Sequence, residues 1–128
     1  MAKLFFTLTG ILLAAQLCYA TPPTEPVISA IRASNADKLS EFFDSNVDLK
    51  ILEKENIFSK SQAGIIVKDF FATYKVTALM VNHEGGPENA RFTICNIITN
   101  SGKFRVYFLY KTINTKIIIQ KFRVEKDE

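Results

Sequence analysis

Nucleophilic chemistry in this sequence would depend on its single histidine, His83, and on Cys95, one of its two cysteines. A catalytic cysteine needs the histidine within hydrogen-bond reach and a third group that orients the pair. Cys95 stands between Ile94 and Asn96 in the middle of a predicted strand, where a cysteine usually packs as a small buried hydrophobe. The sequence therefore favours a structural role for Cys95 over a reactive one.

The small number of histidines and cysteines also argues against a metal site. Proteins hold metal ions with several converging His, Cys, Asp or Glu side chains. His83 is followed by Glu84, but neighbouring residues of a strand point to opposite faces and cannot easily bind one ion. We expect no metal and no other cofactor, and we interpret His83 as a partly exposed residue at a strand end.

General acid–base chemistry needs a carboxylate or a histidine at an inward-facing position. Asp69 falls on the polar side of a predicted helix, and Asp44 and Asp48 fall in or beside a turn. None of these carboxylates is predicted to be a buried acid. Enzyme activity is therefore the less favoured of the two functional classes that we consider.

A pocket for a small apolar molecule is a better hypothesis, because aromatic residues of a long predicted helix would face those of the following strands. The candidate pocket residues are Phe70, Phe71, Tyr74, Phe92, Phe108 and Tyr110. A solid core is the alternative, since aromatic stripes mostly bury themselves. The two tyrosines would be the polar contacts of a ligand, because a buried phenol needs a hydrogen-bond partner.

Basic residues are concentrated in the C-terminal part of the chain, where residues 89–124 contain seven of them and no acidic residue. Those expected to share the outward side of the strands are Arg105, Lys111, Lys121 and Arg123. Such a surface would suit an anionic lipid, a polysaccharide or an acidic protein. The alternative is a solvated face whose lysines discourage edge pairing. Nucleic acid is not expected as a partner, because residues 1–20 have the pattern of a secretory signal peptide and an exported protein seldom meets nucleic acid.

A long amphipathic helix would position three of the candidate pocket residues, Phe70, Phe71 and Tyr74. Ser59 and Gln62 have the spacing of a capping box, which predicts that the helix begins at Lys60. Its apolar residues recur every three or four positions, and they are Ala63, Ile66, Val67, Phe70, Phe71 and Tyr74. This spacing predicts one broad apolar stripe that faces the core.

The remaining elements predict an α+β domain with helices early and strands late. Two short helices precede the long one: the first carries Val27, Ile28 and Ile31, and the second is capped by Asn35 and includes Leu39, Phe42 and Phe43. Residues 46–52 alternate as a half-buried strand. The later strands are expected at 76–84, 90–99, 103–111 and 116–124. Hairpin loops are expected at 100–102 and at 114–115.

The first twenty residues are typical of a secretory signal peptide. Lys3 precedes an apolar run from Leu4 to Leu17, and Cys18 and Ala20 supply small residues for cleavage before Thr21. A membrane anchor is the alternative, but this run is shorter than the ~20 residues that a span needs. A lipoprotein acylated on Cys18 fits poorly, because Leu17 and the residue before it are not small.

Cleavage after Ala20 would leave 108 of the 128 residues and lower the formal net charge from +3 to +2, because Lys3 is lost. We expect an extended tether at 21–26 and a single domain at 27–128. The exported protein would have one cysteine, hence no internal disulfide, and no transmembrane segment. Its expected location is the bacterial periplasm or the extracellular space.

Four stretches carry a resemblance to a known fold and family: "IRASNADKLSEFFDSNVDLKI", "FSKSQAGIIVKDFF", "HEGG" and "GKFRVYFLYK". The chain resembles the nuclear-transport-factor-2-like fold of the cystatin-like superfamily. More narrowly, it resembles a family of small exported bacterial proteins of unknown function. The resemblance implies helices packed on a curved, mostly antiparallel sheet that forms a cone.

The resemblance leaves two functional classes open. Cone folds of this kind often host acid–base chemistry in an apolar cavity, which is the enzyme alternative. Related proteins also pair sheet to sheet, and a homodimer of this chain would use residues expected to be exposed, Tyr107, Leu109, Ile117 and Ile119. We expect a non-catalytic protein that binds a ligand or another protein.

Overall fold

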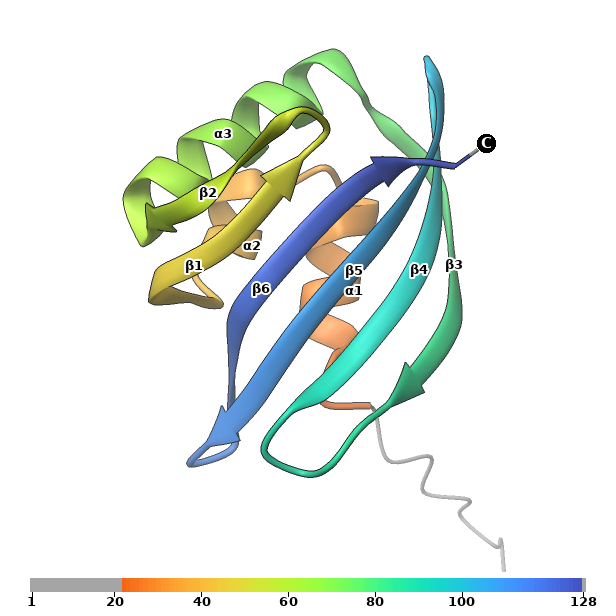
Figure 1. The fold of residues 1–128 in the computed structure, drawn as a ribbon. Helices are drawn as coiled ribbons and strands as arrows, with labels where there is room; N and C mark the ends of the chain where they lie inside the picture. Colours follow the sequence, from red (N-terminus) through yellow and green to blue (C-terminus); the bar gives the residue numbers. More distant parts are fainter. Residues whose placement is uncertain (1–21, 128) are drawn as a thin grey trace, which may run out of the picture.

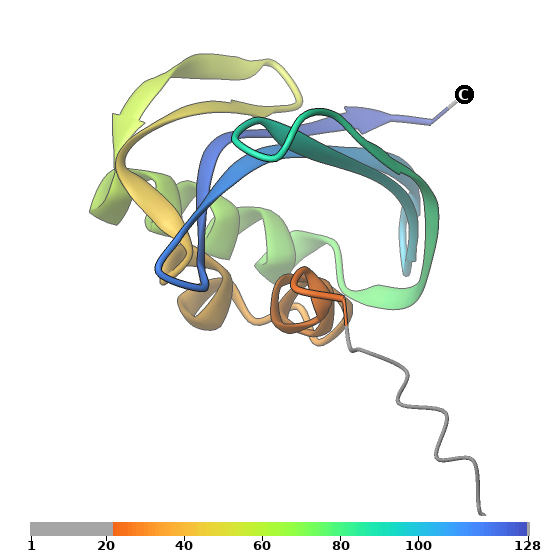
Figure 2. The ribbon, with the colours of Figure 1, turned by 90° about the horizontal axis from the view of Figure 1, so that it is seen from below.

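The structure, a computed structural model, describes residues 22–127, which form three helices and one curved sheet of six strands (Figure 1). The helices are α1 (Glu25–Arg32), α2 (Ala36–Ser40) and α3 (Lys60–Thr73). Figure 2 shows the sheet arching over the helices, which all lie on its concave side. The predicted α+β class is confirmed. Within the same residues, no helix is long and apolar enough to cross a bilayer.

The sheet is antiparallel except at one place. Its strands are β1 (Phe43–Ile51), β2 (Lys54–Ser59), β3 (Val76–Gly85), β4 (Arg91–Thr99), β5 (Gly102–Ile113) and β6 (Lys116–Lys126). Their order is β2-β1-β6-β5-β4-β3, and only β1 and β6 run parallel. The two predicted hairpins, β4–β5 and β5–β6, are confirmed. The parallel pair brings the first strand of the chain beside the last.

The helix α3 begins at the residue that the sequence predicts. Ser59 Oγ accepts a hydrogen bond from the backbone N–H of Gln62, and Gln62 Oε1 accepts one from the backbone N–H of Ser59, both at 3.3 Å. This capping box satisfies two N–H groups that would otherwise lack partners. Gly64 lies where α3 meets α2, and a Cβ at this position would be 3.1 Å from Ser40 Cβ.

The concave side of the sheet is filled by buried apolar side chains. The Phe70 ring of α3 lies 5.3 Å from the Phe104 ring of β5 between centroids, and Tyr74 lies 4.8 Å from the same ring. Phe108 and Phe122 stack at 6.4 Å between neighbouring strands. Burial of each such ring stabilises the fold by about 1.5–3 kcal/mol. The predicted placement of the apolar stripe of α3 against the curved sheet is confirmed.

A β-bulge in β6 corrects the prediction for two isoleucines. Gln120 is an extra residue, because Ile119 and Lys121 pair with consecutive residues of β5. Ile117 and Ile119 are buried, and the buried positions resume at Phe122. The predicted exposure of the two isoleucines is wrong because an extra residue exchanges the two faces of a strand.

The region between α2 and α3 also differs from the prediction. Phe43 opens β1 and is not part of the second helix, which ends at Ser40. The edge strand β2 was not predicted at all, because it is mostly exposed and shows no alternation of apolar residues. The turn before it places Leu52 at φ 57°, a left-handed conformation that usually calls for glycine or asparagine.

The N-terminal segment is helical earlier than expected. The helix α1 begins at Glu25, inside the predicted tether 21–26, and Pro26 occupies its first turn, where a missing N–H costs nothing. The predicted cap of α2 is confirmed, because Asn35 Oδ1 accepts a hydrogen bond from the backbone N–H of Lys38 at 3.0 Å. The predicted signal peptide and its cleavage site lie outside the described residues.

Candidate functional site

The sheet has two faces of different chemistry. We call the concave side, which packs on the helices, the inner face, and the convex side the outer face (Figure 2). Four of the six predicted pocket residues, Phe70, Phe71, Phe108 and Tyr110, are buried in the core between the helices and the inner face. Tyr74 is half-buried beside them, 4.9 Å from Phe70 between ring centroids. The structure therefore brings these five residues together in one aromatic core.

The sixth predicted pocket residue, Phe92, lies on the outer face, which corrects the prediction. The side chains of Thr93 and Cys95 on β4 are fully buried, so Phe92 points away from the core. Its ring stacks on that of Tyr107, with centroids 6.1 Å apart and an interplanar angle of 23°. Phe92 is three residues from the buried Cys95, and side chains separated by an odd number of residues on a strand point to opposite faces.

The structure does not bring His83 and Cys95 together. His83 is exposed and pairs with Ile94, whose side chain shares the outer face, whereas Cys95 is buried on the inner face. Burial raises the pKa of the Cys95 thiol from 9.0 to about 12. A thiol with so high a pKa stays protonated at neutral pH, which supports the packing role that the sequence favours.

The carboxylates considered for acid–base chemistry lie outside the aromatic core. Asp69 is exposed on α3, and Asp44 and Asp48 are half-buried on β1. Over residues 22–127, no three His, Cys, Asp or Glu side chains lie close enough to hold a metal ion.

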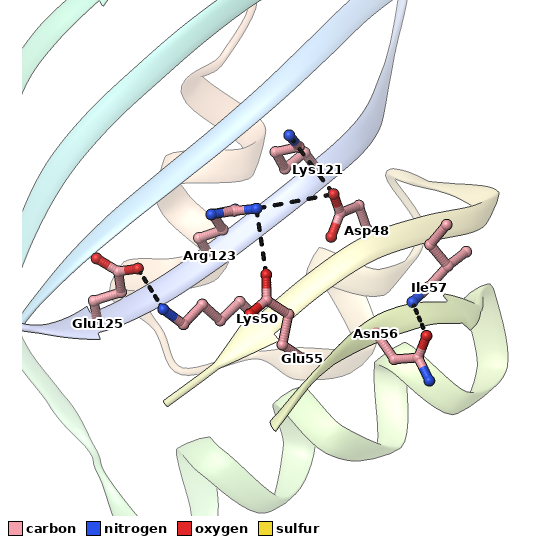
Figure 3. Close-up of polar contacts among 8 residues, drawn as sticks. All are labelled: Asp48, Lys50, Glu55, Asn56, Ile57, Lys121, Arg123 and Glu125. Atoms are coloured by element: carbon pink, nitrogen blue, oxygen red, sulfur yellow. Dashed lines mark hydrogen bonds and ion pairs between the residues drawn. The ribbon is translucent and has the colours of Figure 1, made fainter. Parts of the chain in front are cut away.

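The predicted basic residues are accompanied by acidic residues from distant parts of the chain. Lys121 Nζ and Arg123 Nη2 of β6 lie 3.6 and 4.0 Å from Asp48 Oδ2 of β1. Arg123 Nη2 also donates to Glu55 Oε1 of β2 at 3.5 Å (Figure 3). The parallel pairing of β1 with β6 supplies the acidic residues that the C-terminal sequence lacks.

Arg105 has an acidic neighbour as well, since its Nη2 lies 3.9 Å from Asp127 Oδ1. Asp127 also accepts a hydrogen bond from Asn96 Nδ2 at 2.9 Å. Lys111 lies farther along β5, and no ion pair joins it to another residue of the described segment. The outer face thus carries both signs of charge, and the predicted basic surface is mixed.

The shortest ion pair of the outer face joins β1 to β6. Lys50 Nζ donates to Glu125 Oε1 at 2.8 Å (Figure 3). This hydrogen bond, with the attraction between the two charges, raises the pKa of Lys50 and lowers the pKa of Glu125. Because Glu125 is exposed and Lys50 is only half-buried, the pair fixes the position of Glu125 more than it stabilises the fold.

Two open hollows mark the outer face. The first, which we call the basic hollow, has a volume of about 380 Å³ and is lined by Ile94, Arg105, Tyr107, Lys121, Arg123 and Glu125. The second, which we call the apolar hollow, has a volume of about 240 Å³. It is lined by Ala78, Leu79, Met80, Asn96, Ile97, Ile98, Lys103 and Asp127.

The apolar hollow contains exposed apolar side chains that the sequence analysis missed. Met80 and Ile98 are 68% and 44% exposed, and because both line the same hollow they form a small exposed apolar patch. Ile98 and Phe92 are each three residues from the buried Cys95. Because side chains alternate along a strand, the burial of Cys95 would have placed both on the outer face. The sequence of β3 does not reveal that Met80 is exposed on the outer face. The pairing of β3 with β4 has two irregularities, and these interrupt the alternation of side chains along β3.

Comparison with known proteins identifies a family of unknown function. The family model of DUF4783, a domain of unknown function, matches residues 24–125. A DUF4783 family protein from Bacteroides uniformis is 31% identical, with a TM-score of 0.76 over 81% of this chain and 96% of that chain. One from Bacteroides ovatus is 27% identical, also with a TM-score of 0.76, over 81% and 94%. No match was found among curated proteins.

A more distant neighbour shows the fold alone. A structure described as a calcium/calmodulin-dependent protein kinase type II association domain, from Thiobacillus denitrificans, is 9% identical, with a TM-score of 0.67 over 84% of this chain and 96% of that chain. The fold is nuclear-transport-factor-2-like, as the sequence predicts.

Proposed function

The chain belongs to the DUF4783 family of unknown function, and on this premise we propose that it is an exported, non-catalytic protein-binding module. Its partner is a second copy of the chain, bound through the outer face. The observation that carries the proposal is the pair of exposed apolar residues, Met80 and Ile98, in the apolar hollow. Most apolar residues of the inner face are buried against the helices, although Val81 of the edge strand β3 is 41% exposed. The outer face therefore offers more exposed apolar surface to a partner.

Charge complementarity supports a second copy over an acidic partner. The outer face carries Asp48 beside Lys121 and Arg123, and Asp127 beside Arg105, so it is not uniformly positive. In a two-fold dimer the same patch meets itself, which requires both signs of charge on one surface. A strongly acidic protein would meet these carboxylates as well as the cations, so it would fit the mixed surface less well than a second copy does.

An unpaired polar atom lies beside the same patch. Asn96 Oδ1 is buried, and among the described residues it has no hydrogen-bond partner. Its amide nitrogen is held by Asp127 at 2.9 Å, which fixes the direction of the oxygen. A buried acceptor without a partner costs about 1–3 kcal/mol. Because the oxygen is already covered within one chain, a donor from a second copy would reach it only after the side chain moved.

The two other functions considered from the sequence have less support. A small apolar ligand would need space among Phe70, Phe108 and Tyr110, but their rings are covered by neighbouring side chains. A small enzyme would need an acid or base at the inner face, where the described polar side chains of β4 are threonines.

The test is the oligomeric state of the protein, measured by analytical ultracentrifugation over a range of concentrations. Ile98→Lys and Met80→Lys should each weaken the dimer at least roughly tenfold, because a buried lysine without a partner costs several kcal/mol. Ile65→Lys is the matched control, since Ile65 is 62% exposed on α3, away from the outer face. A wild-type protein that stays monomeric at every concentration would contradict the proposal, as would an equal effect of the control.

Export has its own test, because it is proposed from the sequence of residues 1–20 alone. Mass spectrometry of the protein recovered outside the cytoplasm should give a chain that begins at Thr21.

A further inference from the structure

We propose that the basic hollow binds a small organic anion with a flat apolar body, such as an aromatic carboxylate or sulfonate. The hollow lies on the outer face over β4, β5 and β6. This site goes beyond the proposed self-association. Its cations lie on the face that a second copy would cover, so the experiment below includes a variant that weakens self-association.

The charge of the lining favours an anion. Three cationic side chains, Arg105, Lys121 and Arg123, line the hollow against one acidic residue, Glu125. Glu125 is held at 2.8 Å by Lys50, which does not line the hollow. The negative charge of Glu125 is therefore matched from outside the hollow, as the three cations are partly matched by Asp48, Glu55 and Asp127, which do not line it either.

The cations retain unused hydrogen-bond donors. Their ion pairs with Asp48, Glu55 and Asp127 span 3.5–4.0 Å, whereas a strong charged hydrogen bond spans about 2.7–2.9 Å. Within residues 22–127, Arg123 Nε is buried without any partner. A guanidinium has five N–H donors in a planar fork, which suits a carboxylate or sulfonate. An anion in the hollow would supply acceptors to the accessible donors of Arg105, Lys121 and Arg123, whereas the buried Nε of Arg123 would be reached only after that side chain moved.

The same hollow offers a surface for an apolar ring. Its lining includes Tyr107 and Ile94, and the Tyr107 ring is held from one side by the stacked ring of Phe92. Its volume of about 380 Å³ falls within the range of small-molecule sites, about 300–1,000 Å³. A flat ligand would lie on Tyr107 and direct its acidic group toward the two arginines.

The experiment compares two fluorescent probes that differ in one group. 1-Anilinonaphthalene-8-sulfonate carries the anion, and N-phenyl-1-naphthylamine is its neutral counterpart. We expect saturable binding of the sulfonate to the folded protein and binding of the neutral probe at least tenfold weaker. Equal affinity for the two probes would overturn the proposal, because no anionic group would be needed.

Variants locate the site. Arg123→Gln and Arg105→Gln should each weaken sulfonate binding roughly tenfold, the equivalent of one charged hydrogen bond, and Arg123→Lys should weaken it less. Lys111→Gln is the matched control, because it removes one positive charge from the same sheet face outside the hollow. An equal loss with Lys111→Gln would indicate general attraction to a positive surface, and a loss confined to Tyr110→Phe would indicate the aromatic core. Either result would overturn the site.

Folding and self-association are controlled separately. Thermal unfolding of each variant shows whether a loss of binding reflects a loss of structure, and Arg105 serves as the safer position because its side chain is 58% exposed. The titration is repeated with Ile98→Lys, which lies outside the basic hollow. Sulfonate binding that persists in this variant would support the site whether or not the wild-type protein dimerises, and its loss there without unfolding would contradict the proposal.

Discussion

The environment of Cys95 makes the strongest quantitative prediction. The side chain is fully buried, and burial raises the pKa of its thiol from 9.0 to about 12. At pH 8 the thiolate fraction of the folded protein is then roughly a thousandfold below that of the unfolded chain. We expect Ellman's reagent to react with the native protein only through unfolding, and to react rapidly in 6 M guanidinium chloride.

The assay requires Cys95 to be the single thiol, so it uses the full chain with Cys18→Ser. Reaction of one thiol per chain in denaturant, against almost none in buffer over the same time, is the expected result. Rapid reaction of the native protein at pH 8 would refute both the burial and the packing role. It would also reopen nucleophilic catalysis by this residue.

The same pKa shift predicts a loss of stability in alkali. The folded-state pKa is raised, so the contribution of the protonated thiol is complete below pH 9 and is lost as the pH rises toward 12. The free energy of unfolding should fall by up to about 1.4 kcal/mol per pH unit in this interval. Urea unfolding at pH 8 and 10.5, with Cys95→Ala as the control, isolates this loss from that of lysines and tyrosines. Equal pH dependence of the two proteins would contradict the reasoning.

Two further predictions concern packing and the outer face. Gly64→Leu should lower the free energy of unfolding by about 1–3 kcal/mol, because a Cβ there would already be 3.1 Å from Ser40 Cβ. Adding Ser40→Gly should recover part of the loss, and an unchanged melting temperature would contradict the close packing of α2 on α3. The pKa of Glu125 lies below its ordinary value of 4.5 because Lys50 donates a hydrogen bond to the carboxylate. The ion pair therefore stabilises the fold above pH 4.5, and this stabilisation is lost as the pH falls through the folded-state pKa. Lys50→Met should return the pKa toward 4.5 in a carboxyl titration by NMR, whereas Lys54→Met should not. A Glu125 pKa that is the same in both variants would argue against the pair.

Local signals made most of the fold predictable. The capping box of Ser59 and Gln62, the apolar stripe of α3 and the alternation of β5 each depend on residues close in sequence, and the structure confirms them. β2 left no such signal, because an exposed edge strand has few apolar residues to alternate. The bulge at Gln120 left little trace in the sequence. The buried residues of β6 change from odd to even positions after Ile119, but Ile117, Ile118 and Ile119 are all apolar and do not reveal which of them face the core.

The candidate site was less predictable because it depends on contacts between distant segments. The run of basic residues at 89–124 suggested a positive surface, but β1 returns beside β6 and brings Asp48 to Lys121 and Arg123. Parallel pairing of two strands so far apart in sequence has no local signature. Phe92 was misplaced for a simpler reason, since assigning Cys95 to the core already requires Phe92 to face outward.

The division of the sheet into two faces separates stability from binding. The aromatic core between α3 and the inner face uses the residues that make folding favourable, including Phe104 and Phe108. The side chains of Met80 and Ile98 contribute little to that core, because they are 68% and 44% exposed and lie on the other face of the sheet. Exposed apolar residues that gather in one patch, as these two do in the apolar hollow, are typical of an interaction surface. A binding role for the outer face explains their presence there, and it implies that substitutions in this patch change association without unfolding the protein.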